Sequence, residues 1–234
     1  MSRRLFIFLA AAVCVMSGCS RRQPIVVGSK DSTEQKLLAE ITAQFLERQL
    51  PDAIVQRRFG LGDTRTVQQA LLNNEIGLYP EYTGLVVTEL LKETASDNPT
   101  VVLERARMEL KRISLLEFLA PFGFESRNVL VIRAGDGEKL TTASDAANSK
   151  MRWKVGLSYE FQNKDTGLPS LNTYRLEMGA PLRSMKAEEL FKALANKDVD
   201  LIVTTATDGH LTSGDFKILE DDQKAFPPMT AGLA

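Results

Sequence analysis

The sequence predicts an α/β protein, in which short apolar strands alternate with helices along the chain. Three observations lead to this prediction. The composition, with 44% apolar and 25% charged residues among 234, is that of a soluble globular chain and excludes a disordered one or a coiled coil. Short apolar runs stand at 25–27, 129–133 and 200–203. Segments with helical apolar spacing lie between them.

The first half opens with a strand at 25–27, followed by a helix that starts at the capping pair Ser32 and Gln35. Its apolar residues recur at helical spacing, at Leu38, Ile41 and Phe45. We expect the remaining elements of this half to be strands at 53–59 and 76–79 and helices at 66–74, at 84–93 and after the cap at Asn98-Pro99.

The second half continues the alternation. We expect strands at 129–133, 153–157, 200–203 and 216–219, and helices at 171–178 and 187–196. This order favours a parallel sheet, although the pattern does not decide between one sheet and two.

The first twenty residues have the features of an export signal. Arg3 and Arg4 precede an apolar run at 5–16 that is too short to span a bilayer, and small residues lead to Cys19. The stretch 16–19 resembles a bacterial lipobox, which implies acylation of Cys19, a signal peptide at 1–19 and a tether at 20–24. The alternative is an ordinary signal peptide with an incidental cysteine.

Cysteine content and missing motifs exclude several classes of function. The two cysteines are Cys14 and Cys19, so the exported part contains no disulfide, cysteine nucleophile or thiolate metal site. No metal-ligand spacing or nucleotide-binding glycine motif occurs, so we expect no metal and no cofactor. Asp208, His210 and Ser213 lie within six residues, whereas the members of a catalytic triad come from separate segments. The net charge of −1 gives no sign of the excess positive charge that is typical of nucleic-acid-binding proteins.

Polar residues follow four of the expected strands, where α/β sheets bind ligands. These segments are 28–32, 79–84, 158–164 and 204–210. Lys30 stands beside the free backbone N–H groups of a helix start, an arrangement that suits an anionic group. The alternative is a solvated loop lysine.

These segments also carry motifs that resemble a known family. Residues 75–84, E-I-G-L-Y-P-E-Y-T-G, closely match the E-I-D-L-Y-P-E-Y-T-G of the osmoprotectant-binding proteins, the binding components of ABC importers for glycine betaine, choline and carnitine. Further similar motifs follow in order at 28–35, 61–64, 121–124, 166–169, 207–209 and 219–228. The resemblance covers nearly the whole exported part.

The resemblance implies a two-lobed fold of the periplasmic-binding-protein type (type II) that closes on its ligand. Lobe one would comprise 25–127 plus 216–234, and lobe two 128–215. Members of the family continue well past the Pro227-Pro228 motif, which implies that the C-terminal part of lobe one is truncated here.

The resemblance also implies a set of ligand-binding residues. The family holds a quaternary ammonium in a box of four tyrosines. Tyr82 matches one of these, whereas Asn128, Thr205 and Met229 stand at the other three positions. The polar residues that match the family's ligand contacts are Lys30, Gln35 and Lys164, the last standing where an Arg is common.

Together these features predict a lipid-anchored, exported binding protein that faces the periplasm or the cell exterior. It would work with an ABC permease and an ATPase and bind a small polar solute, most simply one with a carboxylate. One alternative keeps glycine betaine, with Tyr159 or Tyr174 rebuilding the box. Another is a degenerate lipoprotein that acts as a scaffold or sensor without transport. An enzyme is not expected.

Overall fold

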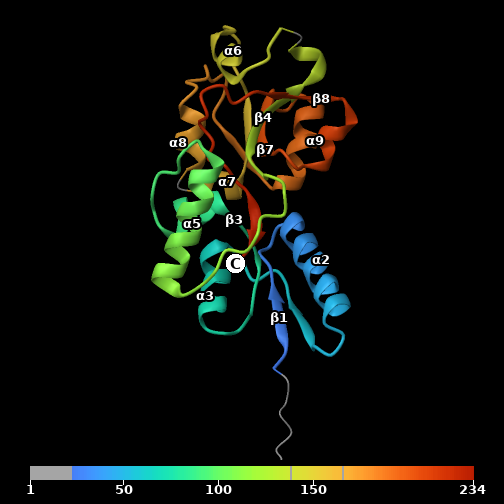
Figure 1. Ribbon diagram of the computed structural model, residues 1–234. Helices are drawn as coiled ribbons and strands as arrows, with labels where there is room; N and C mark the ends of the chain where they lie inside the picture. The colour runs from blue at the N-terminus through green and yellow to red at the C-terminus, as the bar shows by residue number, and fades with distance from the viewer. Residues whose placement is uncertain (1–22, 138, 165) are drawn as a thin grey trace, which may run out of the picture.

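The computed structural model describes residues 23–137, 139–164 and 166–234, which form two lobes, one above the other in Figure 1. The predicted signal peptide, Cys19 and the start of the tether lie outside the described residues. Buried apolar clusters fall into two groups. One group lies within residues 26–124 and 229–234 (lobe one), and the other within 129–226 (lobe two).

Lobe one contains two small sheets. Strand β1 pairs with β2 in parallel, with Ile25 opposite Val55, and β3 pairs with β9 antiparallel. The elements of lobe one are β1 (Ile25–Gly28), α2 (Thr33–Gln49), β2 (Val55–Arg58), α3 (Thr64–Leu72), β3 (Pro80–Tyr82), α4 (Thr83–Leu85), the π-helix η1 (Val86–Leu90), α5 (Pro99–Ser114) and β9 (Ala231–Leu233).

Lobe two is built on one five-stranded sheet with the order β6-β5-β7-β4-β8. Strands β6, β5 and β7 run parallel, while β4 runs antiparallel to both of its neighbours. The elements are β4 (Asn128–Arg133), η2 (Ala134–Asp136), α6 (Ala143–Asn148), β5 (Val155–Ser158), α7 (Tyr159–Asn163), α8 (Gly167–Asn172), β6 (Arg183–Met185), η3 (Ala187–Glu189), α9 (Leu190–Ala195), β7 (Leu201–Thr205), η4 (Gly209–Ser213) and β8 (Phe216–Leu219).

Both expected N-cap residues in lobe one act as caps, although the Gln35 side chain does not return the bond of a full capping box. The Ser32 hydroxyl accepts a hydrogen bond from the backbone N–H of Gln35 at the start of α2. The Asn98 side chain accepts from the backbone N–H groups of Thr100 and Val101, and Pro99 occupies the first turn of α5. These caps satisfy N–H groups that have no partner within the helix.

Four sequence expectations are wrong in detail. The helix expected at 171–178 is α8, which ends at Asn172. The sheet of lobe two is mixed rather than parallel. The strand expected at 76–79 is a single bridge, Val27 to Leu78, followed by β3. Finally, α2 buries Gln35, Ala39, Thr42 and Ala43, so Ile41 and Phe45 are 54% and 60% exposed.

The chain returns to lobe one later than residue 216. Strand β8, expected in lobe one, pairs with β4 of lobe two, because Leu130 lies opposite Leu219. Phe226 is buried in the same cluster as Leu130. Residues 216–226 therefore belong to lobe two.

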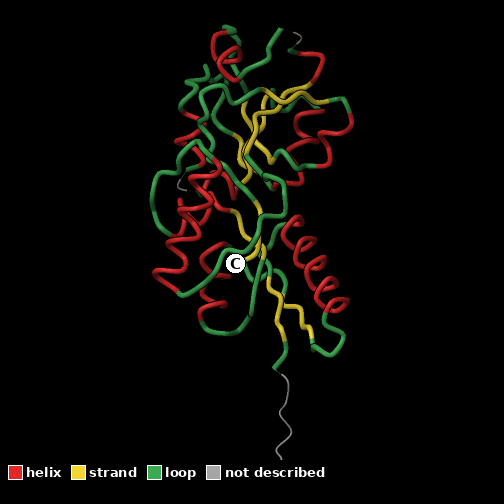
Figure 2. The backbone as a smooth tube through the Cα atoms, in the orientation of Figure 1, coloured by secondary structure: helices red, strands yellow, loops and turns green. Residues whose placement is uncertain are grey.

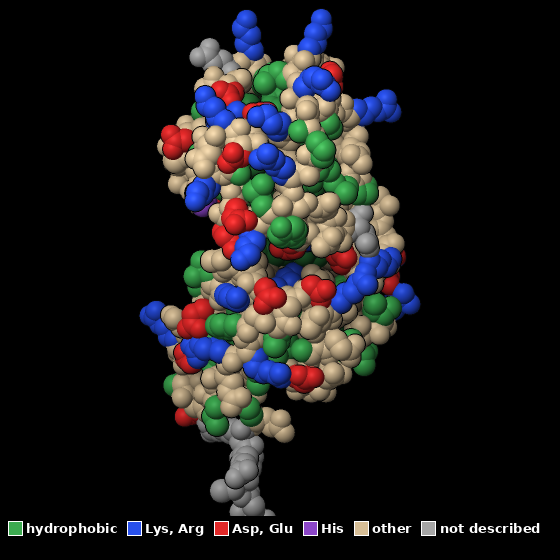
Figure 3. Space-filling model, turned by 180° about the vertical axis from the view of Figure 1, so that it is seen from behind, with side chains coloured by type: hydrophobic (Ala, Val, Ile, Leu, Met, Phe, Trp, Pro, Cys, Tyr) green, Lys and Arg blue, Asp and Glu red, His purple; other side chains and the backbone are tan. Residues whose placement is uncertain are grey.

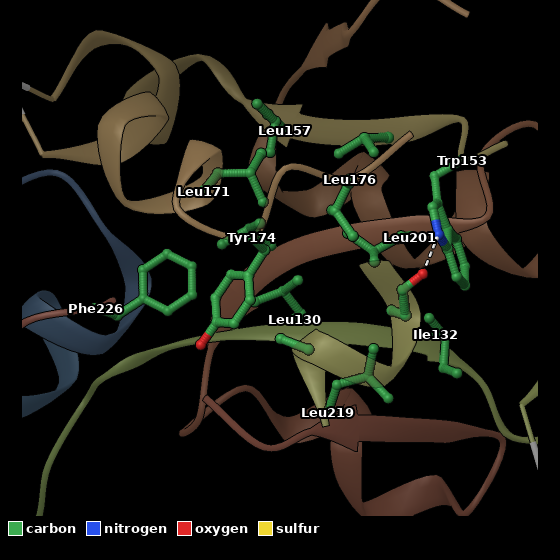
Figure 4. Close-up of a cluster of buried hydrophobic side chains, with 14 of the residues drawn as sticks. Leu130, Ile132, Trp153, Leu157, Leu171, Tyr174, Leu176, Leu201, Leu219 and Phe226 are labelled. Atoms are coloured by element: carbon green, nitrogen blue, oxygen red, sulfur yellow. Dashed lines mark hydrogen bonds between the residues drawn. The ribbon is translucent and has the colours of Figure 1, made fainter. Parts of the chain in front are cut away.

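The core of lobe two centres on one tryptophan and one tyrosine (Figure 4). Trp153 is 1% exposed, and its indole Nε1 donates to the Ala146 carbonyl oxygen at 3.0 Å. The Tyr174 hydroxyl donates to Asp221, which ties the chain after β8 to this core. Buried aromatic side chains with a satisfied polar tip make large contributions to stability.

Two segments connect the lobes, and both are loop rather than helix or sheet (Figure 2). The first is 124–127 and the second is 227–230. They lie side by side, because the Ser126 N–H donates to the Met229 carbonyl at 2.9 Å and Glu125 forms an antiparallel bridge with Thr230. A paired two-segment connection is the place where one lobe can rotate against the other.

Within the described part of the chain, none of the helices is long and apolar enough to cross a bilayer.

Candidate binding site between the lobes

The edge of the lobe-two sheet nearest lobe one brings several predicted site residues together. Strands β5 and β7 are parallel, so their carboxyl ends share this edge, and the antiparallel β4 begins there. Asn128 lies directly opposite Thr205 in the register of β4 and β7. Lys164 follows α7, which continues directly from β5. This is the edge where sheets of this kind bind ligands.

Lys30 lies on the lobe-one side, in the loop after β1. Its ammonium Nζ donates to Glu81 Oε1 at 2.5 Å and to Thr64 Oγ1 at 3.1 Å, and only 7% of the residue is exposed. It also lies 5.0 Å from the centre of the Tyr82 ring, within reach of a cation–π attraction. Burial lowers the pKa of Lys30, while the Glu81 carboxylate opposes that shift. Lys30 is thus a buried, paired lysine rather than a solvated one.

Charged side chains of lobe two act on Lys30 across the gap. Lys164 Nζ lies 2.9 Å from Glu160 Oε1. After burial and the opposing pull of Glu81, the charge of Lys164 lowers the pKa of Lys30 further. The pKa of Glu160 is lowered by Lys164 first and by Lys30 as well. The charges of the two lysines therefore act on one another although they belong to different lobes.

Tyr82 and Met229 pack together in lobe one. They share one buried cluster with Leu85 and Ala231. Gly84 makes the packing possible, because a Cβ there would overlap the Pro228 carbonyl and lie 2.7 Å from Met229 Sδ. Burial, helped by the charge of Glu34, raises the pKa of Tyr82 well above its usual range, so its hydroxyl remains a donor.

Gln35 lies in the first turn of α2 and is 1% exposed. Neither its amide nitrogen nor its amide oxygen has a hydrogen-bond partner among the described residues. A buried amide without a partner costs free energy, and such a cost is typical of a group that serves a ligand.

The structure therefore gathers the predicted residues in two sets. Lys30, Gln35, Tyr82 and Met229 come from lobe one, and Asn128, Lys164 and Thr205 come from the facing edge of lobe two. Seen from behind, the waist between the lobes is hollowed, with basic and acidic side chains around it (Figure 3).

Tyr174 does not rebuild the cage, because it is 3% exposed within the lobe-two core and bonded to Asp221. Tyr159 is 55% exposed at the start of α7. A separate open hollow of about 640 Å³ lies on lobe two near Tyr174 and Arg175, and none of the predicted site residues lines it.

Sequence reasoning missed three polar residues of this region. Glu81 pairs with Lys30, and Glu34 accepts hydrogen bonds from the hydroxyls of Tyr82 and Thr207. The three missed residues, Glu34, Glu81 and Thr207, lie inside the motifs at 28–35, 75–84 and 207–209. The motifs were a signal for importance, but the spacing within them does not reveal partners from distant segments.

Comparison with known proteins shows the family of the chain. The sequence profile described as the substrate-binding domain of ABC-type glycine betaine transport systems matches residues 23–233. The chain belongs to this family. It is a family of transport-associated binding proteins and not of enzymes, as predicted.

Two relatives and one solved structure illustrate the match. An ergothioneine transport permease/ergothioneine binding protein of Helicobacter pylori is 28% identical over 98% of this chain, which spans only 41% of that protein. A glycine-betaine-binding protein of Pseudomonas aeruginosa is 28% identical over 94% of this chain and 73% of its own length. A crystal structure of a glycine betaine/carnitine/choline ABC transporter protein has a TM-score of 0.77 at 21% identity, covering 89% of this chain and 78% of that one. This last likeness confirms the two-lobed α/β fold.

Proposed function

We propose that this protein is the solute-binding component of an ABC importer of the osmoprotectant type, and that it closes its lobes on a small polar solute with a carboxylate. The observation on which this rests is the placement of one lysine on each lobe: Lys30 follows β1 of lobe one, and Lys164 follows β5 and α7 at the edge of the lobe-two sheet. Two ammonium groups that face one space favour an anionic group between them.

The residues at the cage positions support a polar solute. Tyr82 remains as an aromatic wall, but Lys30 already lies 5.0 Å from its ring centre. Asn128 and Thr205, opposite one another in lobe two, offer hydrogen bonds in place of aromatic faces. Each lost cation–π contact removes roughly 0.5–2 kcal/mol of affinity for a quaternary ammonium. Recognition therefore shifts from the ammonium end of the solute to its carboxylate end.

The two lysines differ in their role. Lys30 uses two of its three donors on Glu81 and Thr64, so it has one N–H left for a solute. The Lys164 side chain is 25% exposed and pairs with Glu160, an exposed carboxylate. We infer that Lys164 makes the main contact with the solute carboxylate, and that Gln35 and Tyr82 contribute the polar contacts from lobe one.

The remaining parts of the proposal concern partners and location. The protein would deliver its solute to an ABC permease that works with a separate ATPase. A lipid on Cys19 would anchor it outside the cytoplasm, and the short segment 20–24 would serve as the tether. No observation favours the alternative of a scaffold without transport.

A thermal melt of the purified protein with a panel of solutes tests the proposal. The panel holds glycine betaine, carnitine, ergothioneine, choline and simple amino acids. A solute at 100 times its Kd adds about 2.7 kcal/mol to the stability, which raises the Tm by roughly 5–10 °C for a chain of this length. We expect such a shift with at least one carboxylate-bearing solute and a smaller one with choline at the same concentration.

Two variants sharpen this experiment. Lys164→Gln removes the proposed carboxylate contact and should abolish most of the shift. Lys192→Gln is the matched control, because Lys192 lies exposed on α9, away from the cleft. A shift that survives in Lys164→Gln, or one that Lys192→Gln abolishes equally, would contradict the assigned role of Lys164.

A further inference from the structure

One carboxylate joins the two lobes. Glu34 lies in the first turn of α2, in lobe one. Its Oε1 accepts a hydrogen bond from the Tyr82 hydroxyl of lobe one, and its Oε2 accepts one from the Thr207 hydroxyl of lobe two. The two oxygens thus serve two lobes at once.

Thr207 carries this contact into the rest of the cleft. It follows β7 by two residues, and its Oγ1 lies 3.3 Å from that of Thr205, a proposed solute contact. It also lies 3.0 Å from Ser126 Oγ in the first connecting segment. Because a hydroxyl donates one hydrogen and accepts others, Thr207 can donate to Glu34 and accept from Ser126. Glu34 is therefore linked to a wall of the site and to the connection between the lobes.

A second contact between the lobes differs from this one in position. Lys224 Nζ lies 2.8 Å from Asp97 Oδ2, and both side chains are at least half exposed. Lys224 stands three residues before the second connecting segment, so rotation about that segment moves it little. Exposed ion pairs of this kind contribute little to stability. The Glu34 contact lies beside the site instead, where closure brings separate surfaces together.

We propose that Glu34 is a positioning residue that acts as an interlobe latch: it holds Tyr82 in the wall of the site and fastens the lobes to one another through Thr207. For its effect on affinity, this inference rests on the proposed function. A solute that needs the closed form binds with an apparent affinity equal to its intrinsic affinity multiplied by the fraction of molecules that are closed. Weakening the latch therefore weakens solute binding without removing a solute contact.

The four tyrosines of the chain make the latch observable without any solute. Protein labelled with 3-fluorotyrosine gives one ¹⁹F resonance for each tyrosine, assigned with Tyr→Phe variants. Tyr82 reports on the latch from lobe one. Tyr174, bonded to Asp221 inside lobe two, is the internal control.

The variants separate a link between lobes from a local contact. Thr207→Val removes the lobe-two hydroxyl at nearly constant volume, and Thr207→Ser restores it. Glu34→Gln replaces the carboxylate with an amide that has only one acceptor oxygen. Lys224→Gln removes the other interlobe pair and is the matched control.

We expect Thr207→Val to move the Tyr82 resonance in the same direction as Glu34→Gln, and Thr207→Ser and Lys224→Gln to leave it in place. The Tyr174 resonance should stay unchanged throughout. We also expect Glu34→Gln and Thr207→Val to weaken solute binding roughly tenfold to a hundredfold, because a hydrogen bond to a charged group is lost.

Two results would overturn the inference. In one, Thr207→Val leaves the Tyr82 resonance unmoved, so Glu34 serves Tyr82 alone. In the other, the resonance moves but the affinity for the solute is unaltered. If none of the solutes shifts the melting curve, the proposed function fails, whereas the solute-free spectra still decide whether the latch exists.

Discussion

At the scale of single residues, the buried pair of Lys30 and Glu81 is the most demanding feature of the site. Both side chains are less than a tenth exposed, and their charged atoms lie 2.5 Å apart. Two buried charges cost desolvation energy that their attraction offsets only when both are present. The pair therefore adds little net stability, and we interpret it as a requirement of the site.

A double-mutant cycle measures this pair. Lys30→Met should leave the Glu81 carboxylate buried without its partner and cost about 3–5 kcal/mol, and Glu81→Leu should cost a similar amount. The double variant should cost far less than the sum. Urea unfolding of the four proteins checks this, and additive costs would show that the two charges do not depend on one another.

Gly84 allows a prediction about close packing. A Cβ at this position overlaps the Pro228 carbonyl oxygen and approaches Met229 Sδ. The carbonyl is a backbone atom, so it moves away less easily than a side chain does. We expect Gly84→Ala to lower stability by about 1–3 kcal/mol, as overpacking does. Gly135→Ala is the control, because nothing lies within 4 Å of a Cβ there. Equal urea midpoints for the two variants would contradict the packing described.

Residue-level reasoning from the sequence proposed site residues but did not predict their partners. Lys30 was interpreted as free to meet a solute, whereas the fold places Glu81, 51 residues away, against its ammonium. Glu34 meets Thr207 across 173 residues. No local pattern encodes such pairs, because tertiary folding alone brings their segments together.

At the scale of elements, helix caps were predictable and buried faces were not. Ser32 and Asn98 act as expected, since a capping side chain and its N–H partners are neighbours in sequence. The buried face of α2 was predicted wrongly. Ala39 and Ala43, both fully buried, let the helix pack closely against the rest of lobe one. Larger apolar residues such as Ile41 then remain exposed, against the usual rule for helical spacing.

The cap of α5 gives a direct test at this scale. Asn98 accepts from two backbone N–H groups at the start of this 16-residue helix. Asn98→Ala should lower stability by about 0.5–2 kcal/mol, and Asn98→Asp should retain most of it. Chemical unfolding checks both variants, and an alanine variant as stable as the parent would show that the cap is dispensable.

The start of α6 predicts a dependence on pH. Hydrogen bonds from the Thr141 hydroxyl and from the N–H groups of Thr141 and Thr142 lower the pKa of Asp145 from 3.8 to about 2. A folded-state pKa below the unfolded value means that the stabilisation is present above the unfolded pKa and is lost as the pH falls toward the folded one. Asp145→Asn should therefore cost stability near neutral pH.

The measurement is the difference between the urea midpoints of the parent and Asp145→Asn at several pH values. We expect that difference to be constant above about pH 5 and to narrow as the pH falls below about pH 4. A difference that does not depend on pH would mean that the charge of Asp145 plays no part in the cap.

At the scale of the whole molecule, the sequence predicted two lobes but misplaced the point where the chain returns. An apolar run such as 216–219 predicts a strand without naming its sheet. Its pairing with β4 depends on the direction in which β4 enters lobe two after the first connection. The mixed sheet has the same origin, because β4 begins at the edge where β5 and β7 end.

Recognition of a carboxylate between two lobes is the central claim of this account. Glycine betaine and choline share a trimethylammonium group and differ in that one ends in a carboxylate and the other in a hydroxyl. Calorimetric titration of the purified protein with each compares the two ends of the solute directly. The account predicts that glycine betaine binds roughly tenfold to a hundredfold more tightly, since a hydrogen bond to a charged group is worth about 1.5–3 kcal/mol. Choline that binds as tightly as glycine betaine would contradict it.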